Sequence, residues 1–328
     1  MIDTKQQRFQ ILALSGGGFR GLYTAKILAD IEDQIGAPIA SKFDLIAGTS
    51  IGGILALAVA LEIPAQKMVD LFEKHGEDIF KPRFNFFGTL RSAYSPEPLK
   101  RLLQDESLFG QQPLGECKHP VIVPAINYSR GEPQLFKTPH HLDFIRDHKF
   151  ALVDVALATS AAPMYFPRHT FNNNQYVDGG LYANAPGQLA VHEAQQFMGQ
   201  SIESIYVLAV GTMSKQPLWC LDWGGLKPAK TPERLFSVSI SVLETLTHKV
   251  LGHQLEGRYT LIDDALTDEV SKAVALDKTD ASAREALLGA GSERSKAFLG
   301  SAESKPFLAH QPSPPVFYHG HNAAKENF

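Results

Sequence analysis

Short apolar runs alternate with segments of helical spacing through the first two thirds of the chain. The first run covers residues 9–14, a glycine-rich loop follows it, and apolar residues then recur at helical spacing over 22–35. Such runs predict buried strands, and the spacing predicts amphipathic helices. Further strands are predicted at 43–47, 121–126 and 205–210, and further helices at 51–61, after Pro64, and at 96–104, 152–159 and 188–198. Strands alternating with helices predict a three-layer α/β/α sandwich around a mostly parallel central sheet.

The pattern changes after about Gly211. Residues 232–255 and 281–299 are predicted to be helical, whereas 304–328 contains four prolines that exclude a long helix. No internal repeat is visible. We therefore expect a catalytic core over 9–211 and a helical, proline-rich extension over 212–328 that packs on this core.

One segment has the character of a membrane span. Residues 45–61 contain no charged side chain, and their 17 positions reach the lower limit for a transmembrane helix. Glycines interrupt the segment near its start, however, and a buried strand that turns into a buried helix explains the same pattern. The N-terminus is polar and lacks the apolar stretch of a signal peptide. We expect a cytoplasmic protein.

Charge and cysteine content exclude other classes. A formal net charge of −4 gives no basis for binding DNA or RNA, which requires an excess of basic residues. The two cysteines, Cys117 and Cys220, are far apart in the sequence, so neither a disulfide framework nor a zinc site is predicted. We expect no metal ion at the functional site.

The loop after the first strand contains Gly16, Gly17, Gly18 and Gly21. Its spacing matches the dinucleotide fingerprint, but that fold requires an acidic residue at the end of the second strand, and none is present. The alternative is an oxyanion hole, because consecutive glycines let the backbone turn its N–H groups toward a developing negative charge. Arg20 would then anchor the loop or contact a lipid head group, or else it is a surface arginine.

A G-x-S-x-G sequence lies at the end of the second strand, with Ser50 at its centre. Its other members are Gly48, Thr49, Ile51 and Gly52. A nucleophilic serine needs a sharp strand-to-helix turn with small flanking residues, and both conditions are met. An N-cap serine would fit the same position, but the triple-glycine loop one strand earlier favours a nucleophile.

The base that would activate this serine has two candidates. Seven of the twelve histidines, all of which follow Ser50, are considered for a triad: His140, His141, His148, His169, His192, His248 and His253. None lies in a glycine-bracketed loop. Asp178 does, because a short strand leads into Asp178-Gly179-Gly180. An ordinary turn would have the same sequence.

The glycine loop, the Ser50 motif and Asp178-Gly179-Gly180, in this order, resemble the three signature blocks of the patatin-like phospholipases. Residues 159–166, rich in alanine and proline, add to the resemblance, which spans about 9–211. It implies a Ser50–Asp178 dyad without a catalytic histidine, an oxyanion hole that includes Gly16–Gly18, Arg20 and Gly21, and release of fatty acids from membrane phospholipids. It also implies that catalysis needs no cofactor.

A finer resemblance concerns three further segments, 137–141, 222–225 and 317–320. They are similar to the bacterial patatin-like effectors of CBASS anti-phage signalling, which implies activation by a cyclic di- or trinucleotide, with a homo-oligomer on activation, and action at the inner face of the cell membrane. Residues 81–91 mix aromatic and basic side chains, as an interfacial loop or a half-buried core segment would. Two other functions stay open: a constitutive carboxylesterase with a Ser–His–acid triad, and a nucleotide-binding module without hydrolysis.

Overall fold

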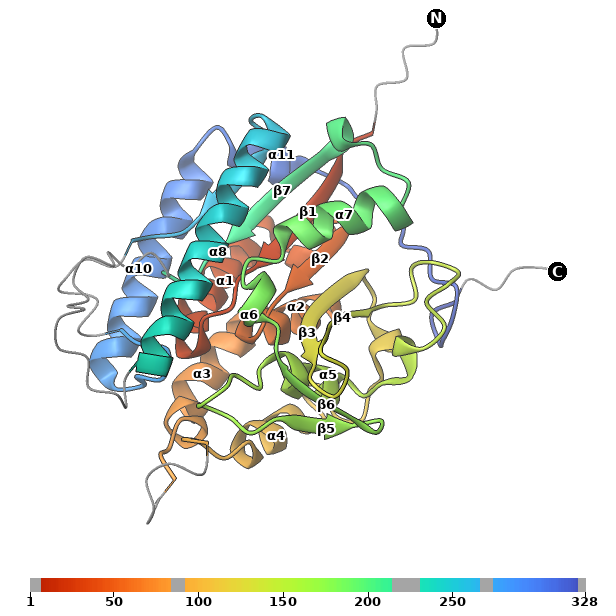
Figure 1. The fold of residues 1–328 in the computed structure, drawn as a ribbon. Coiled ribbons are helices and arrows are strands. Elements are labelled where there is room, and N and C mark those ends of the chain that lie inside the picture. The colour runs from red at the N-terminus through yellow and green to blue at the C-terminus, as the bar shows by residue number, and fades with distance from the viewer. Residues whose placement is uncertain (1–6, 84–91, 214–230, 266–273, 324–328) are drawn as a thin grey trace, which may run out of the picture.

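The described residues form one sheet of eight strands. Figure 1 shows helices on both sides of this sheet. The computed structural model describes residues 7–83, 92–213, 231–265 and 274–323. The strands are β1 (Phe9–Leu14), β2 (Leu45–Gly48), β3 (Val121–Asn127), β4 (Glu132–Lys137), β5 (His169–Phe171), β6 (Asn174–Asp178), β7 (Ile205–Val210) and β8 (Tyr259–Ile262). The α/β/α architecture predicted from the alternation of strands and helices is confirmed.

The centre of the sheet is parallel and one side of it is antiparallel. Strand order is β5-β6-β3-β2-β1-β7-β8, and β4 pairs with β3 outside this path. The pairs β3–β2, β2–β1, β1–β7 and β7–β8 are parallel, whereas β4, β5 and β6 form antiparallel pairs. Leu14 pairs with Gly48, so β1 and β2 end at the same level and the loops that follow them are neighbours.

The helices cover both faces of the sheet. They are α1 (Gly21–Ile35), α2 (Ile51–Ala60), α3 (Ala65–Ile79), α4 (Glu97–Leu103), α5 (Leu152–Thr159), α6 (Gly180–Ala183), α7 (Gly187–Phe197), α8 (Thr231–Leu255), α10 (Ala281–Gly300) and α11 (Ser304–Ala309). On β1, Ile11 and Ala13 pack in the cluster that contains α7 and the end of α8, while Leu12 and Leu14 pack with α1 and α2. Side chains that alternate between two buried faces explain why β1 is apolar at every position except Gln10, whose buried amide donates to the Lys42 and Phe307 carbonyls.

The chain beyond residue 211 joins the sandwich through β8, α8 and α10. Strand β8 pairs with β7 and extends the sheet, and α10 buries Leu287, Gly291 and Phe298, with Gly291 lying against α1. The helices predicted at 232–255 and 281–299 are confirmed. Strand β8 was not predicted, because a four-residue edge strand depends on its partner and carries little pattern of its own.

The uncharged segment 45–61 forms β2 and the buried helix α2. Within the described ranges, no helix combines the length and apolar character that a bilayer crossing requires. Most of the predicted interfacial loop, 84–91, lies outside the described residues, as does segment 222–225.

Candidate active site

Ser50 lies at the turn between β2 and α2, in a backbone conformation that residues other than glycine rarely adopt. Its φ is 57° and its ψ is −126°. The turn is tight: a Cβ on Gly48 would lie 2.0 Å from the Gly52 carbonyl oxygen, and a Cβ on Gly52 would lie 2.3 Å from the Leu14 oxygen. Both glycines are therefore required by close approach of the backbone. The turn presents the Ser50 side chain beyond the ends of the strands, as a nucleophile requires.

Two threonines hold this turn in place. The Ser50 N–H donates to the Thr159 hydroxyl at 3.0 Å, and that hydroxyl donates to the Pro124 carbonyl at 2.6 Å. The Thr49 hydroxyl donates to the Ala183 carbonyl at 2.6 Å. A strained backbone persists only where the surrounding structure fixes it. The buried hydrogen bonds of Thr49 and Thr159 fix the strained conformation of Ser50 in this way.

Asp178 meets Ser50 across the sheet. The Ser50 hydroxyl donates to Asp178 Oδ2 at 2.6 Å, and the Gly180 N–H donates to Asp178 Oδ1 at 2.7 Å. Asp178 ends β6 and pairs with Ala125 in the middle of β3. The antiparallel pairing thus brings a residue distant in sequence to the level of the turn after β2. Both carboxylate oxygens are directed by defined donors.

Burial changes the proton affinity of this carboxylate. Asp178 is 3% exposed. Burial raises the pKa of Asp178 to about 6, and the hydrogen bonds from Ser50 and the Gly180 N–H lower it in part. Removal from water disfavours the charged form of an acid, so the carboxylate becomes a stronger base than a solvated one. It is matched to accept a proton near neutral pH.

The glycine loop lies directly beside Ser50. A Cβ on Gly16 would be 3.1 Å from the Ser50 Cβ. The N–H of Gly16 donates to the Asn184 carbonyl, that of Arg20 to Gly17, and that of Gly21 to carbonyls of the preceding turn. The N–H groups of Gly17 and Gly18 have no acceptor among the described residues. Gly18 has a φ of +59°, which favours glycine and turns the loop. Within this loop, Gly17 and Gly18 are therefore the available donors.

Arg20 is buried and anchors the loop. Its Nε donates to the Gly17 carbonyl and its guanidinium to the Met213 carbonyl, at 3.4 and 3.2 Å. Burial lowers the pKa of Arg20, and the neighbouring Glu244 and Asp263 raise it. Arg20 is 7% exposed, so the interpretation of a surface arginine is wrong. It also lines the cavity that contains Ser50.

A cavity of about 440 Å³ contains Ser50, Asp178 and the glycine loop. One part of its wall is apolar and consists of side chains from α2, α3, α4 and the segment after α5: Ile54, Phe72, Ile79, Phe80, Leu99 and Phe166. The wall is closed in part by residues 275–277. The carbonyl of Leu276 accepts from the Phe19 N–H at 2.7 Å, and Asp277 accepts from the Tyr94 hydroxyl at 2.6 Å.

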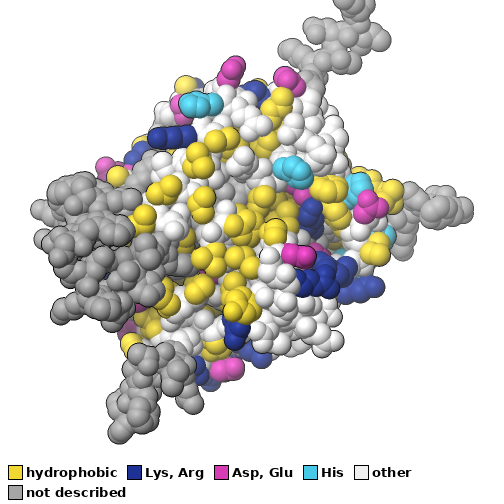
Figure 2. All heavy atoms as spheres, viewed as in Figure 1, with side chains coloured by type: hydrophobic (Ala, Val, Ile, Leu, Met, Phe, Trp, Pro, Cys, Tyr) yellow, Lys and Arg dark blue, Asp and Glu magenta, His cyan; other side chains and the backbone are white. Residues whose placement is uncertain are grey.

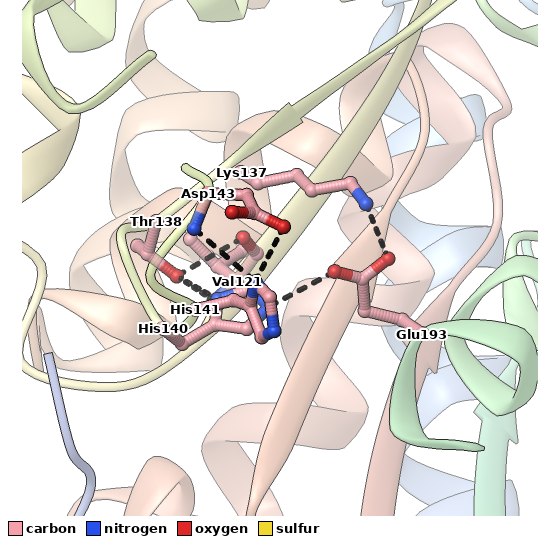
Figure 3. A network of polar contacts seen from close by, with 7 residues as sticks. All are labelled: Val121, Lys137, Thr138, His140, His141, Asp143 and Glu193. Atoms are coloured by element: carbon pink, nitrogen blue, oxygen red, sulfur yellow. Dashed lines mark hydrogen bonds and ion pairs between the residues drawn. The ribbon is translucent and has the colours of Figure 1, made fainter. Parts of the chain in front are cut away.

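The histidines considered for a triad lie elsewhere. None of the seven lines the cavity. Figure 3 shows His140 between Thr138 and Glu193, where both ring nitrogens are engaged, at 2.8 and 3.0 Å. Lys137 holds the other oxygen of Glu193 at 2.6 Å. His169 pairs with Asp154 at 2.8 Å, and His192 and His253 are exposed. The structure therefore brings Asp178, and no histidine, to Ser50.

Comparison with known proteins agrees with these features. A family model described as patatin-like phospholipase matches residues 12–191. The chain is 43% identical over 324 residues to a cGAMP-activated phospholipase of Pseudomonas aeruginosa, with 96% of each chain covered. The chain belongs to the patatin-like phospholipase family. A second cGAMP-activated phospholipase, from Vibrio cholerae, is 32% identical over 330 residues, which cover 88% of this chain and 90% of that protein.

Among solved structures, the patatin-like chain is similar to VipD from Legionella pneumophila. The TM-score is 0.47 with 10% identity, over 89% of this chain and 67% of that one. Three residues that surround the glycine loop and the turn at Ser50 were not predicted from the sequence: Thr159, Asn184 and Glu244. Thr159 begins the segment 159–166 that resembles the family, and Asn184 follows Asp178 by six positions. Glu244 carries no such signal in the sequence, because its contacts arise only when α8 packs on the core.

Proposed function

We propose that this protein hydrolyses acyl esters of phospholipids with Ser50 as nucleophile and Asp178 as base. The observation that carries the proposal is the 2.6 Å hydrogen bond from the Ser50 hydroxyl to a buried carboxylate beside a glycine loop with two available N–H donors. A serine within hydrogen-bond reach of its base is the arrangement that nucleophilic catalysis requires.

The reaction follows from these positions. Asp178 Oδ2 accepts the Ser50 proton as Oγ attacks the ester carbonyl, and the N–H groups of Gly17 and Gly18 stabilise the oxyanion. The tetrahedral intermediate collapses, the C–O bond to the glycerol breaks, and Asp178 returns the proton to the leaving alcohol. Asp178 then takes a proton from water as the water oxygen attacks the acyl-enzyme carbonyl. The bond from that carbon to Ser50 Oγ breaks, Asp178 returns the proton to Oγ, and the fatty acid leaves with Ser50 and Asp178 restored.

The lipid character of the substrate is supported by the cavity and by the face around it. The apolar wall suits an acyl chain. Figure 2 shows hydrophobic side chains gathered around α6 and α8, and Val242 and Leu246 on α8 are 52% and 55% exposed. Ser241 and Glu244 of the same helix line the cavity. We propose that the protein acts peripherally, with this face toward the inner surface of the cell membrane.

Activation by a cyclic oligonucleotide is the second part of the proposal. It is supported by the names of two relatives, both cGAMP-activated phospholipases, which match nearly the whole chain. A cyclic di- or trinucleotide would switch the enzyme on during anti-phage defence, and a homo-oligomer on activation is part of the same hypothesis. We assign no residues to the nucleotide site.

The test is fatty-acid release from phospholipid vesicles, with and without cGAMP and other cyclic di- and trinucleotides. Wild type should release fatty acid, more so with one of the nucleotides, and Ser50→Ala and Asp178→Asn should both be nearly inactive. Because the two residues act as one unit, the double variant should be little worse than either single variant.

Two other outcomes would replace the proposal. If Asp178→Asn stayed active while a folded single-histidine variant lost activity, a Ser–His–acid carboxylesterase would be the correct assignment. If cGAMP bound but a fluorophosphonate probe never labelled Ser50, the chain would be a nucleotide-binding module. If no cyclic nucleotide changed the rate of hydrolysis, the proposed Ser50–Asp178 hydrolase would stand and the proposed activation would be wrong.

A further inference from the structure

Asn184 holds the glycine loop from both sides of Gly16. Its carbonyl accepts from the Gly16 N–H at 3.0 Å, and its side-chain Nδ2 donates to the Gly16 carbonyl at 3.2 Å. The Thr212 hydroxyl donates to the same carbonyl at 3.0 Å. Since the peptide after Gly16 carries the N–H of Gly17, the orientation of the Gly16 carbonyl also sets the direction of that donor.

The Asn184 side chain is itself oriented by Glu244. Nδ2 donates to Glu244 Oε2 at 3.1 Å. The Asn184 amide nitrogen therefore donates to two oxygens, that of the Gly16 carbonyl and that of Glu244. A carboxylate only accepts, so it directs Nδ2, and not the amide oxygen, toward Gly16. With the amide reversed, its oxygen would face two other oxygens. Asn184 is 5% exposed and Glu244 is 3% exposed, so water cannot substitute easily for either group.

Neighbouring groups keep this buried carboxylate in place. Glu244 lies near Arg20, which it affects electrostatically, and its Oε1 is 3.7 Å from His248 Nε2. His248 Nδ1 contacts the Tyr259 hydroxyl of β8. Burial raises the pKa of Tyr259, so it remains a neutral phenol and can donate to Nδ1. When the phenol donates to Nδ1, a neutral imidazole carries its proton on Nε2, the nitrogen nearer to Glu244. A buried carboxylate needs such partners.

We propose that Glu244 is a positioning residue of the reaction: through Asn184 it sets the orientation of the glycine loop that receives the oxyanion. The proposal rests on the proposed function, because the loop orientation matters only if the loop stabilises a charge. Glu244 comes from α8, outside residues 12–191 that match the family model. The extension thereby contributes to the site in addition to covering it.

The experiment compares variants of the full chain that keep or remove the acceptor. Glu244→Gln keeps an oxygen that can accept from Asn184, Glu244→Met fills similar space without one, and Asn184→Ala removes the intermediate group. Glu285→Gln, an exposed carboxylate on α10, is the matched control. The measurements are kcat and KM on a soluble short-chain ester, and the rate at which a fluorophosphonate labels Ser50.

Glu244→Met is expected to lower kcat and the labelling rate about 10²-fold, as for loss or misplacement of an oxyanion donor, with KM nearly unchanged. Glu244→Gln should recover most of this loss, and Glu285→Gln should match wild type. Asn184→Ala should resemble Glu244→Met, and the double variant should be no worse than either, because residues acting through one another give non-additive losses.

Additive losses, or a Glu244→Met protein labelled at the wild-type rate, would overturn the inference. The inference would also be overturned if Glu244→Gln and Glu244→Met lost kcat and labelling rate equally, in proportion to a lowered melting temperature. If Glu244→Met does not fold, Glu244→Ala is compared with Glu244→Gln in the same way. Labelling does not depend on the natural ester, so failure of wild type to release fatty acid from vesicles would overturn the proposed function alone.

Discussion

At the scale of single residues, the site depends on groups that burial has changed. Asp178 is surrounded by protein, and its raised pKa follows from lost solvation more than from any charged neighbour. Ser50 has a backbone conformation that is unfavourable by about 1–3 kcal/mol. Both features oppose stability and favour reactivity, and the surrounding hydrogen bonds maintain them.

The pH dependence of catalysis should follow Asp178. In the proposed mechanism the carboxylate form of Asp178 is the base, so kcat/KM on a soluble ester should fall as the pH drops through about 6 and should level off above 7. Rates between pH 4.5 and 8.5, with a check that the protein stays folded, provide the measurement. An ascending limb centred near 4 would mean that the carboxylate is solvated in the working enzyme.

The same shift predicts a pH-dependent stability. In the unfolded chain Asp178 has its ordinary pKa of about 4, so folding favours the protonated form of its carboxyl group. The stabilisation that this group gives the folded protein is fully present below pH 4 and is lost as the pH rises through 6. Asp178→Asn should therefore be more stable than wild type at pH 8, by on the order of 2–3 kcal/mol, with the difference vanishing near pH 4. Denaturant unfolding at both pH values measures this.

Thr159 should affect both stability and turnover. Thr159→Val keeps the shape but leaves the Ser50 N–H without its buried acceptor, which should reduce the free energy of unfolding by about 1–3 kcal/mol. Turnover should fall about ten- to hundredfold as the turn relaxes. Ser160→Ala, at the next position, is the control. Unchanged turnover in Thr159→Val would show that the glycines alone hold the turn.

At the scale of elements, the cavity is formed by segments distant in sequence. Helices α2, α3 and α4 provide the apolar wall, α8 provides Ser241 and Glu244, and residues 275–277 lie over the glycine loop. The Leu276 carbonyl contacts the loop directly, and Asp277 accepts a hydrogen bond from Tyr94, whose ring packs against Phe80 and Phe166 of the apolar wall. Access to Ser50 thus depends on how these residues are held.

Loss of the hydrogen bond between Tyr94 and Asp277 should make the cavity more accessible. Tyr94→Phe removes only the hydroxyl that donates to Asp277, and we expect the labelling of Ser50 by a bulky fluorophosphonate to become about fivefold faster, the equivalent of ~1 kcal/mol. Tyr128→Phe, at a tyrosine that is 54% exposed, is the matched control. Slower labelling in Tyr94→Phe would indicate that the segment completes the site instead of covering it.

At the scale of the whole molecule, the extension is integrated with the core. Strand β8 pairs along β7, Leu251 and Leu255 of α8 pack in the cluster that contains β1 and β7, and α10 packs on α1. Removing these elements would expose one edge of the sheet and parts of both faces. The boundary expected near residue 211 therefore marks a change in sequence pattern and not a boundary between two independently folding units. We expect residues 9–211 to need the extension in order to fold.

A chain that ends at residue 211 should not unfold cooperatively, because it loses apolar contacts on both faces of the sheet. Circular dichroism during thermal unfolding, with fluorophosphonate labelling of Ser50, compares it with the full chain. A truncated protein with a cooperative transition and labelled Ser50 would show that residues 9–211 form an independent domain.

The sequence by itself determined the order of most elements and where chemistry was to be expected. Strands such as 9–14 and 205–210 are mostly apolar, and glycines mark the turns, so local pattern and steric demand were enough to predict them. Gly48, Ser50 and Gly52 are close in sequence, and the resemblance to a family supplied Asp178. The short strands β4, β5 and β8 carry too little pattern, because each depends on its pairing partner.

Only the tertiary structure decided which residues meet. Ser50 and Asp178 are 128 positions apart and become partners because β6 runs antiparallel to β3. His140 was equally available in the sequence, yet Thr138 and Glu193 engage both of its nitrogens. Arg20 and Glu244 are ordinary charged residues in the sequence, and burial beside the glycine loop gives them their positions. Contacts and desolvation depend on the packing of the whole chain, so local sequence does not specify them.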